Sequence, residues 1–289
     1  MIWRLTLLLA GALWLCGCGA PDAARDWPAP SPAIWQVTAP EGAHSGWLFG
    51  TVHALPDDIP WRSAALDEAL GRSGVLVVEI ADLDDGSAAR SAFDAVSREP
   101  GLPPLIDRLP KSGRERLEGV LADAGVGRNA YAGIKTWAAA LMLASTLRDY
   151  DPANGVDRVL IDQAEHVAGL ESFSEQYASF DSLSRQAQVA LVRAIVEEPG
   201  GARQDARIEA WLTGDLDSLD SLSEEALLTD PELRQTLLVE RNHAWARQIA
   251  ALIAQGRRPF VAVGAGHMLG EEGLPALLDA RGFRVARLQ

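Results

Sequence analysis

Two stretches of the sequence share a pattern that strongly constrains the fold: an apolar run stops at a glycine, and a histidine follows three residues later. One is WLFGTVHALP, Trp47–Pro56, near the start of the chain, and the other is FVAVGAGHMLG, Phe260–Gly270, near its end. Short apolar runs bounded by glycine are typical of buried strands. In open α/β sheets, ligands bind at the carboxyl ends of the strands. The pattern therefore predicts that His53 and His267 form two halves of one site.

The rest of the sequence predicts strands near both ends and helices between them. GVLVVEI, residues 74–80, is apolar on both faces, as expected of a strand buried in a parallel or mixed sheet. Further strands are expected at 34–38, 46–49, 168–170, 260–263 and 283–288. Helices are expected at 62–70, 114–124, 136–147, 154–167, 184–197, 203–212, 230–256 and 274–281. We therefore expect an α/β (α+β) fold with a central mixed or parallel sheet, flanking helices and a large helical insert between the two Gly-x-x-His halves.

The N-terminal segment has the features of an export signal. MIWRLTLLLAGALWLCGCGAPDA combines a basic Arg4, a short apolar core and small residues. Residues 15–18, LCGC, resemble a bacterial lipobox in which Cys18 receives lipid; an ordinary signal peptide is the alternative. We expect a signal peptide at 1–17, a lipidated Pro- and Ala-rich tether at 18–31 and a single domain at 32–289. This predicts a lipoprotein of the bacterial cell envelope that faces the periplasm, at the outer membrane.

Cysteine usage and charge narrow the classes of partner. Cys16 and Cys18 are the two cysteines of the chain, so the expected domain has none with which to form a disulfide. The net charge of −14 comes with no basic run, which argues against a nucleic-acid-binding surface. The expected partner of the N-terminal lipid is the membrane.

The glycines around His267 first suggest a nucleotide loop. Gly264, Gly266 and Gly270 follow a predicted strand and precede a predicted helix. A dinucleotide fingerprint also needs a complete βαβ unit with an acidic residue on the order of 20 residues further on. The chain ends before such a unit is complete. These glycines are better explained by close backbone approach around His267.

A metal or acid–base site fits the pattern better. His53, Glu79 and His267 all lie at predicted strand ends, and two imidazoles with one carboxylate commonly bind a catalytic divalent ion. Glu79 ends a buried strand, where a carboxylate needs an ion pair or a metal. Arg241 offers the ion pair, because it falls on the apolar stripe of the helix at 230–256 with Asn242 beside it. The sequence leaves both interpretations of Glu79 open.

A further acidic segment, GLESFSEQ, follows the short strand at 168–170. Glu171 can reach the same sheet edge, and Gln176 lies five residues later on the next helix. Asp157 opens the helix before that strand, where a carboxylate also suits the helix dipole. The remaining histidines, His44, His166 and His243, have no such context and are expected at the surface, with His166 and His243 in charged helices.

Together these motifs resemble the TraB/GumN family, which includes the Tiki metalloproteases. The matching segments are LFGTVHALP, VLVVEI, NGVDRVLIDQAEHVAGLESFSEQ, ERNHAWARQI and FVAVGAGHMLGEEGLPALLDARGFRV, in that order. The resemblance implies an α/β fold of the erythromycin-esterase-like superfamily, with His53, Glu79 and His267 as metal ligands. Arg241, Asn242, Glu171 and Gln176 match its supporting positions. His166 stands where family members often have lysine.

The sequence thus predicts a metal-dependent hydrolase, a peptidase acting on a peptide or polypeptide substrate, with a divalent ion of unknown identity as cofactor. Glu171 is the candidate base and Arg241 the candidate stabiliser of charge, while Asn242, Gln176 and Asp157 support them. Two alternatives remain. One is a metal-independent hydrolase in which His53 activates water. The other is a lipoprotein that binds a peptide or glycan without turning it over.

Overall fold

A computed structural model of the chain describes residues 25–197, 201–224 and 229–289. It contains one six-stranded mixed sheet in the order β4-β3-β5-β2-β1-β6. The strands are β1 (Ile34–Thr38), β2 (Ser45–Thr51), β3 (Val75–Val78), β4 (Val167–Gly169), β5 (Pro259–Gly264) and β6 (Arg284–Arg287). The α/β fold with a central mixed sheet is confirmed, and each strand expected from the sequence is present to within a few residues.

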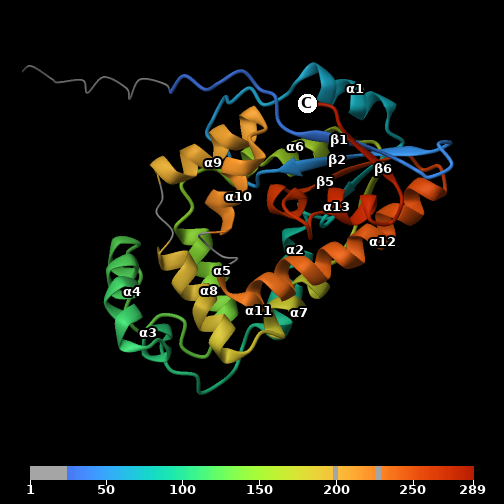
Figure 1. Cartoon of the computed structure of the whole chain (residues 1–289). Coiled ribbons are helices and arrows are strands. Elements are labelled where there is room, and N and C mark those ends of the chain that lie inside the picture. The colour runs from blue at the N-terminus through green and yellow to red at the C-terminus, as the bar shows by residue number, and fades with distance from the viewer. Residues whose placement is uncertain (1–24, 198–200, 225–228) are drawn as a thin grey trace, which may run out of the picture.

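The helices pack on the sheet and form the insert beside it (Figure 1). They are α1 (Ala64–Arg72), α2 (Gly86–Val96), α3 (Leu105–Arg108), α4 (Lys111–Asp123), α5 (Thr136–Thr146), α6 (Val156–Gln163), α7 (Phe173–Asp181), α8 (Arg185–Glu197), α9 (Ala202–Thr213), α10 (Leu216–Glu224), α11 (Pro231–Arg234), α12 (Glu240–Ala254) and α13 (Leu274–Asp279). Short turns η1 (Pro152–Asn154), η3 (Gln235–Val239) and η4 (Ala265–Met268) complete the elements discussed below.

The register of the parallel strands brings their carboxyl ends to one edge. Thr51 at the end of β2 is opposite Gly264 at the end of β5, and Val78 at the end of β3 is opposite Ala262. β3 also pairs in parallel with β4, whereas β1 is antiparallel to both β2 and β6. The chain segments that follow β2, β3, β4 and β5 therefore leave the sheet side by side.

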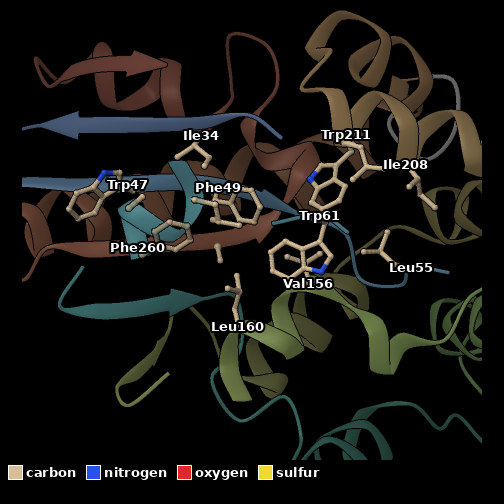
Figure 2. Packing of buried hydrophobic residues seen from close by; sticks show 14 of the residues in the cluster. Ile34, Trp47, Phe49, Leu55, Trp61, Val156, Leu160, Ile208, Trp211 and Phe260 are labelled. Atoms are coloured by element: carbon tan, nitrogen blue, oxygen red, sulfur yellow. The ribbon is translucent and has the colours of Figure 1, made fainter. Parts of the chain in front are cut away.

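Each face of the sheet has its own apolar core. On one face, the Phe49 ring packs against Trp61, Trp211 and Phe260, with ring centroids 5.9 to 6.4 Å apart, in a cluster that α6 and α9 cover (Figure 2). On the other face, α12 and α13 cover a cluster that includes Val261 and Trp245. These two cores fix the strands rigidly, which suits a site built at their ends.

The helical insert has a third core of its own. Residues from α3, α4, α5, α8, α11 and η3 form it, including the fully buried Trp137. The consecutive helical segments α11, η3 and α12 join the insert to the sheet. Leu233 of α11 and Leu237 of η3 belong to the insert core, while Trp245 of α12 belongs to the sheet core.

The structure corrects several details of the sequence-based prediction. The expected helix at 230–256 is interrupted by the π-helical turn η3, because Glu240 donates its backbone N–H to Gln235 five residues earlier. His166 is exposed, as expected, but it lies in a bend before β4 and not in a helix. Helices α2, α3 and α10 were not expected.

The described part of the tether lies against α9 and the first sheet core. Arg25 donates to Asp205 and Glu209 of α9 at 2.6 and 2.8 Å, and Trp27 packs against the first sheet core. Cys18 and the expected signal peptide lie outside the described residues. Within the described residues, no helix is long and apolar enough to cross a membrane.

Candidate functional site

Gly264, the last residue of β5, marks the point where the three expected ligands meet. A Cβ placed on Gly264 would lie 3.2 Å from Glu79 Oε1, 3.2 Å from His53 Nε2 and 3.7 Å from His267 Cδ2. Side chains from β2, β3 and β5 thus converge on one space that a larger residue at 264 would fill. Glycine at this position lets the three side chains approach the backbone closely.

His53 follows β2 by two residues and is fixed by the start of α6. Val156 donates its backbone N–H to Val52, and Gly155 packs so closely on the His53 carbonyl that a Cβ there would stand 2.6 Å from it. This contact brings Asp157 Oδ2 to 3.4 Å from His53 Nδ1. The carboxylate therefore orients the ring with Nε2 toward Gly264.

The same contacts favour a proton on His53. Partial desolvation lowers its pKa, but the hydrogen bond to Asp157 and the charges of Asp157 and Glu79 more than offset this and raise the pKa to about 9. Solvent still reaches 61% of the His53 side chain, whereas 13% of the Asp157 side chain is exposed. His53 is thus the open member of the cluster. In the described structure, Asp157 Oδ1 is buried without a hydrogen-bond partner.

His267, on the turn η4 after β5, is by contrast enclosed by α12. Asn242 donates its amide Nδ2 to the carbonyl of Glu272 at 2.7 Å, which leaves Asn242 Oδ1 to accept from His267 Nδ1 at 2.6 Å. Nδ1 therefore carries the ring proton, and Nε2 faces the site, where it can accept from Arg241 Nη1 at 3.4 Å. Burial lowers the pKa of His267 to about 3, so the ring is neutral.

Glu79, the residue after β3, is ionised and held from two sides. Gly264 donates its backbone N–H to Oε1 at 2.8 Å, and Arg241 donates to Oε2 at 2.8 Å. Burial alone would raise the pKa of Glu79, but the surrounding His267, Arg241 and His53 lower it to about 2. Both interpretations of Glu79 are therefore compatible, because it pairs with Arg241 and still points Oε1 at His267 Nε2, 3.9 Å away.

Arg241 links two carboxylates of the site, Glu79 and Glu171. Its Nε and Nη2 donate to the two oxygens of Glu171 at 3.1 and 2.7 Å, and Gln176 donates to the same carboxylate at 3.2 Å. Glu171 is buried next to β4, and this burial raises its pKa despite the arginine. Arg241 Nη1 also lies 3.4 Å from His267 Nε2.

The turn η3 helps to aim this arginine. A π-helical turn widens the helix by one residue, and such turns are frequent at functional sites. Here it immediately precedes α12, and the Leu237 carbonyl within it accepts from Arg241 Nη1 at 3.0 Å. The consecutive residues Arg241 and Asn242 therefore both face the site, with 13% and almost none of their surfaces exposed.

The donor set fits a divalent ion in its chemistry. His53 and His267 each present Nε2 while a carboxylate or amide holds Nδ1, the usual arrangement behind metal-binding histidines. Ligands stand about 2 Å from such an ion, hence roughly 3 to 4 Å from each other. The 3.9 Å between His267 Nε2 and Glu79 Oε1 matches that spacing. Among the described residues, however, no group of three His, Cys, Asp or Glu side chains already stands at metal-ligand spacing.

All the site residues expected from the sequence, apart from Cys18, thus lie in one connected cluster. The other histidines lie outside it: His243 contacts Glu272 at 3.1 Å and His44 packs on Gly256. Sequence reasoning missed the role of Trp245. Its ring contacts both His267 and Arg241, and the available signal was its position four residues after Arg241.

Comparison with known proteins places the chain in a family. A family model described as the TraB/PrgY/gumN family matches residues 33–287. The chain is also similar to the uncharacterized protein YbaP of Shigella flexneri, with 25% identity over 259 residues that cover 86% of this chain and 92% of YbaP. No solved structure matches the chain significantly. The chain belongs to the TraB/PrgY/gumN family.

Proposed function

We propose that this protein is a metal-dependent hydrolase, specifically a peptidase of the Tiki type on an erythromycin-esterase-like fold. The observation that carries the proposal is the convergence of His53, Glu79 and His267 around Gly264. Their Nδ1 partners Asp157 and Asn242 support it, because both imidazoles present Nε2 to the site. His53, as the exposed member, has room to close on an ion.

A divalent ion bound there would lower the pKa of a water molecule and polarise a scissile carbonyl. Around it, the protein supplies a neutral His267 and an ionised Glu79, both fixed by hydrogen bonds. Arg241 stands beside them with Nη1 3.4 Å from His267 Nε2, where it can stabilise negative charge that develops on a substrate oxygen.

The proton acceptor of this reaction needs a free lone pair. Glu171 is the candidate expected from the sequence, and its raised pKa suits a base. Both of its oxygens are engaged by Arg241, however, so Glu171 acts first as the residue that holds Arg241. His53 is not available as the acceptor here, because its Nε2 binds the ion and its Nδ1 contacts Asp157, so Glu171 remains the candidate base of the metal-dependent reaction.

The contact between His53 and Asp157 also supports a second candidate, a metal-independent hydrolase with His53 as the base. The observation that favours it is that Arg241 already neutralises Glu79, so the buried carboxylate has a cation without a metal. In that case His53 would take a proton from water directly, while Asp157 orients its ring.

A peptide-library cleavage screen on the purified protein, with and without chelator, tests both candidates. Cleavage that stops with chelator and returns with added divalent ion supports the metal-dependent hydrolase. Cleavage that persists with chelator but is lost in His53→Ala supports the second candidate. Peptide or glycan binding without cleavage would overturn both and leave a non-enzymatic binding lipoprotein.

We further propose that Cys18 carries lipid and tethers the domain to the bacterial envelope, facing the periplasm at the outer membrane. The motive is the LCGC segment before the Pro- and Ala-rich tether. Metabolic labelling with a fatty acid should mark the wild-type chain and not Cys18→Ser. Equal labelling of the two chains, or none in the wild type, would contradict this.

A further inference from the structure

Trp245 lies between two residues of the site and touches both. Its ring centroid is 4.5 Å from that of His267, with the planes tilted by 45°. The Arg241 guanidinium carbon lies 4.5 Å from the Trp245 ring centroid. The side chain is almost completely buried, with 1% of the residue exposed. No polar atom of Trp245 takes part in the hydrogen bonds described for the site.

The three residues of α12 hold His267 in complementary ways. Asn242 contacts Nδ1, Arg241 approaches Nε2 and Trp245 packs against the ring. The contact between the Arg241 guanidinium and His267 Nε2 is kept only if both side chains stay in fixed orientations. An aromatic face attracts a guanidinium and favours a tilted neighbouring ring, so one indole can fix both partners at once.

We propose that Trp245 is a positioning residue of the site, which uses its aromatic face to fix the positions of Arg241 and His267 relative to each other. The inference rests on the proposed function, because it assigns Trp245 to the same reaction. Trp245 also fills the sheet core together with Ile249 and Val261, so packing is the competing explanation. The two explanations differ in what they require of the side chain: positioning needs an aromatic face, whereas packing needs only apolar volume.

Two substitutions separate these requirements. Trp245→Phe keeps an aromatic face, while Trp245→Leu keeps apolar character without one, and both lose volume. Trp137 provides a control, since it is fully buried in the insert core and stacks on Tyr177 and Phe180 instead of on the site; its substitution also removes the hydrogen bond from Nε1 to Asp181. Trp137→Phe and Trp137→Leu therefore report the effect of shrinking a buried tryptophan elsewhere.

The first readout is kinetic. We expect Trp245→Leu to lower kcat by about tenfold or more with KM within about twofold, and Trp245→Phe to restore most of the rate. Trp137→Phe and Trp137→Leu should lower the melting temperature without lowering kcat selectively over KM. If Trp245→Phe and Trp245→Leu lose activity in proportion to their loss of stability, packing explains the residue and the proposal is wrong.

The second readout needs no substrate. Ring ¹⁵N shifts of His267 in the metal-free protein should show a single Nδ1–H tautomer in the wild type, in Trp245→Phe and in both Trp137 variants. Trp245→Leu should show a mixed or altered pattern. An unchanged pattern in a folded Trp245→Leu overturns the proposal. If the wild type cleaves no peptide, the proposed function fails while this measurement still decides the role of Trp245.

Discussion

Arg241 and Glu171 form a two-pronged ion pair across 70 residues of sequence. Nε lies 3.1 Å from Oε2 and Nη2 lies 2.7 Å from Oε1, while 13% and 8% of the two side chains are exposed. The same Nη2 also reaches Glu79. One largely buried cation thus pairs with two largely buried carboxylates, and both lose their ion pair if the arginine is removed.

Arg241→Ala should therefore destabilise the fold by about 3–5 kcal/mol, because it leaves buried charge uncompensated. Arg241→Lys keeps the charge but not the two-pronged geometry, so it should fold closer to normal and lose most activity. Urea unfolding and a peptide-cleavage assay measure the two effects. An alanine variant with wild-type stability and activity would show that Arg241 is not part of the functional site.

Gly264→Ala should block the site with little effect on the fold. The added Cβ would stand 3.2 Å from both Glu79 Oε1 and His53 Nε2, in the space where the ligands converge, while the backbone of Gly264 at φ −46° and ψ 135° accepts alanine. We expect loss of metal binding and of cleavage. Gly266→Ala is the control, because nothing lies within 4 Å of its added Cβ. Equal behaviour of the two variants would argue against the space beside Gly264 as the ligand site.

Metal affinity should rise with pH up to about 9. Partial desolvation lowers the pKa of His53, but Asp157 and Glu79 raise it to about 9, so below that pH an ion must displace a proton from the imidazole. Asp157→Asn removes one of the charges and should move the rise to lower pH. Mn²⁺ titrations followed by the EPR signal of the free ion measure this. An affinity independent of pH in the wild type would show that His53 is not a ligand.

Acid should destabilise the metal-free protein partly through His267. Burial holds its pKa at about 3 in the folded state, so the unfolded chain binds the proton first. The contribution of His267 to stability is present above its ordinary pKa of about 6.5 and is lost as the pH falls toward about 3. Melting temperatures of the wild type and His267→Gln should converge or cross over this range. The exposed His166→Gln should follow the wild type, and a constant difference between wild type and His267→Gln would refute the shift.

The sheet and the ends of its strands could be predicted from the sequence because buried strands leave a strong local signal. The apolar runs before His53, Glu79 and His267 each stop where the strand stops, and parallel pairing then brings those ends together. Arg241 was predictable as an inward-facing charge because it interrupts an apolar stripe. These inferences need only local pattern and sheet geometry.

Other features leave no such signal. The π-turn η3 retains apolar residues at helical spacing, so its extra residue is invisible in the pattern. Helix α2 buries none of its residues fully, so the burial that would make its helical pattern stand out is missing. The link between Asp157 and His53 depends on Gly155 packing on the His53 carbonyl, a contact about 100 residues apart in sequence that only the fold creates.

The metal content of the purified protein tests the central claim most directly. After incubation with a mixture of divalent ions and desalting, elemental analysis of the wild type should find about one ion per chain. His53→Ala, Glu79→Gln and His267→Ala should each lose it, while His243→Ala, at the surface pair with Glu272, should retain it. No bound ion in the folded wild type, or retention in all three site variants, would contradict the assignment of His53, Glu79 and His267 as metal ligands.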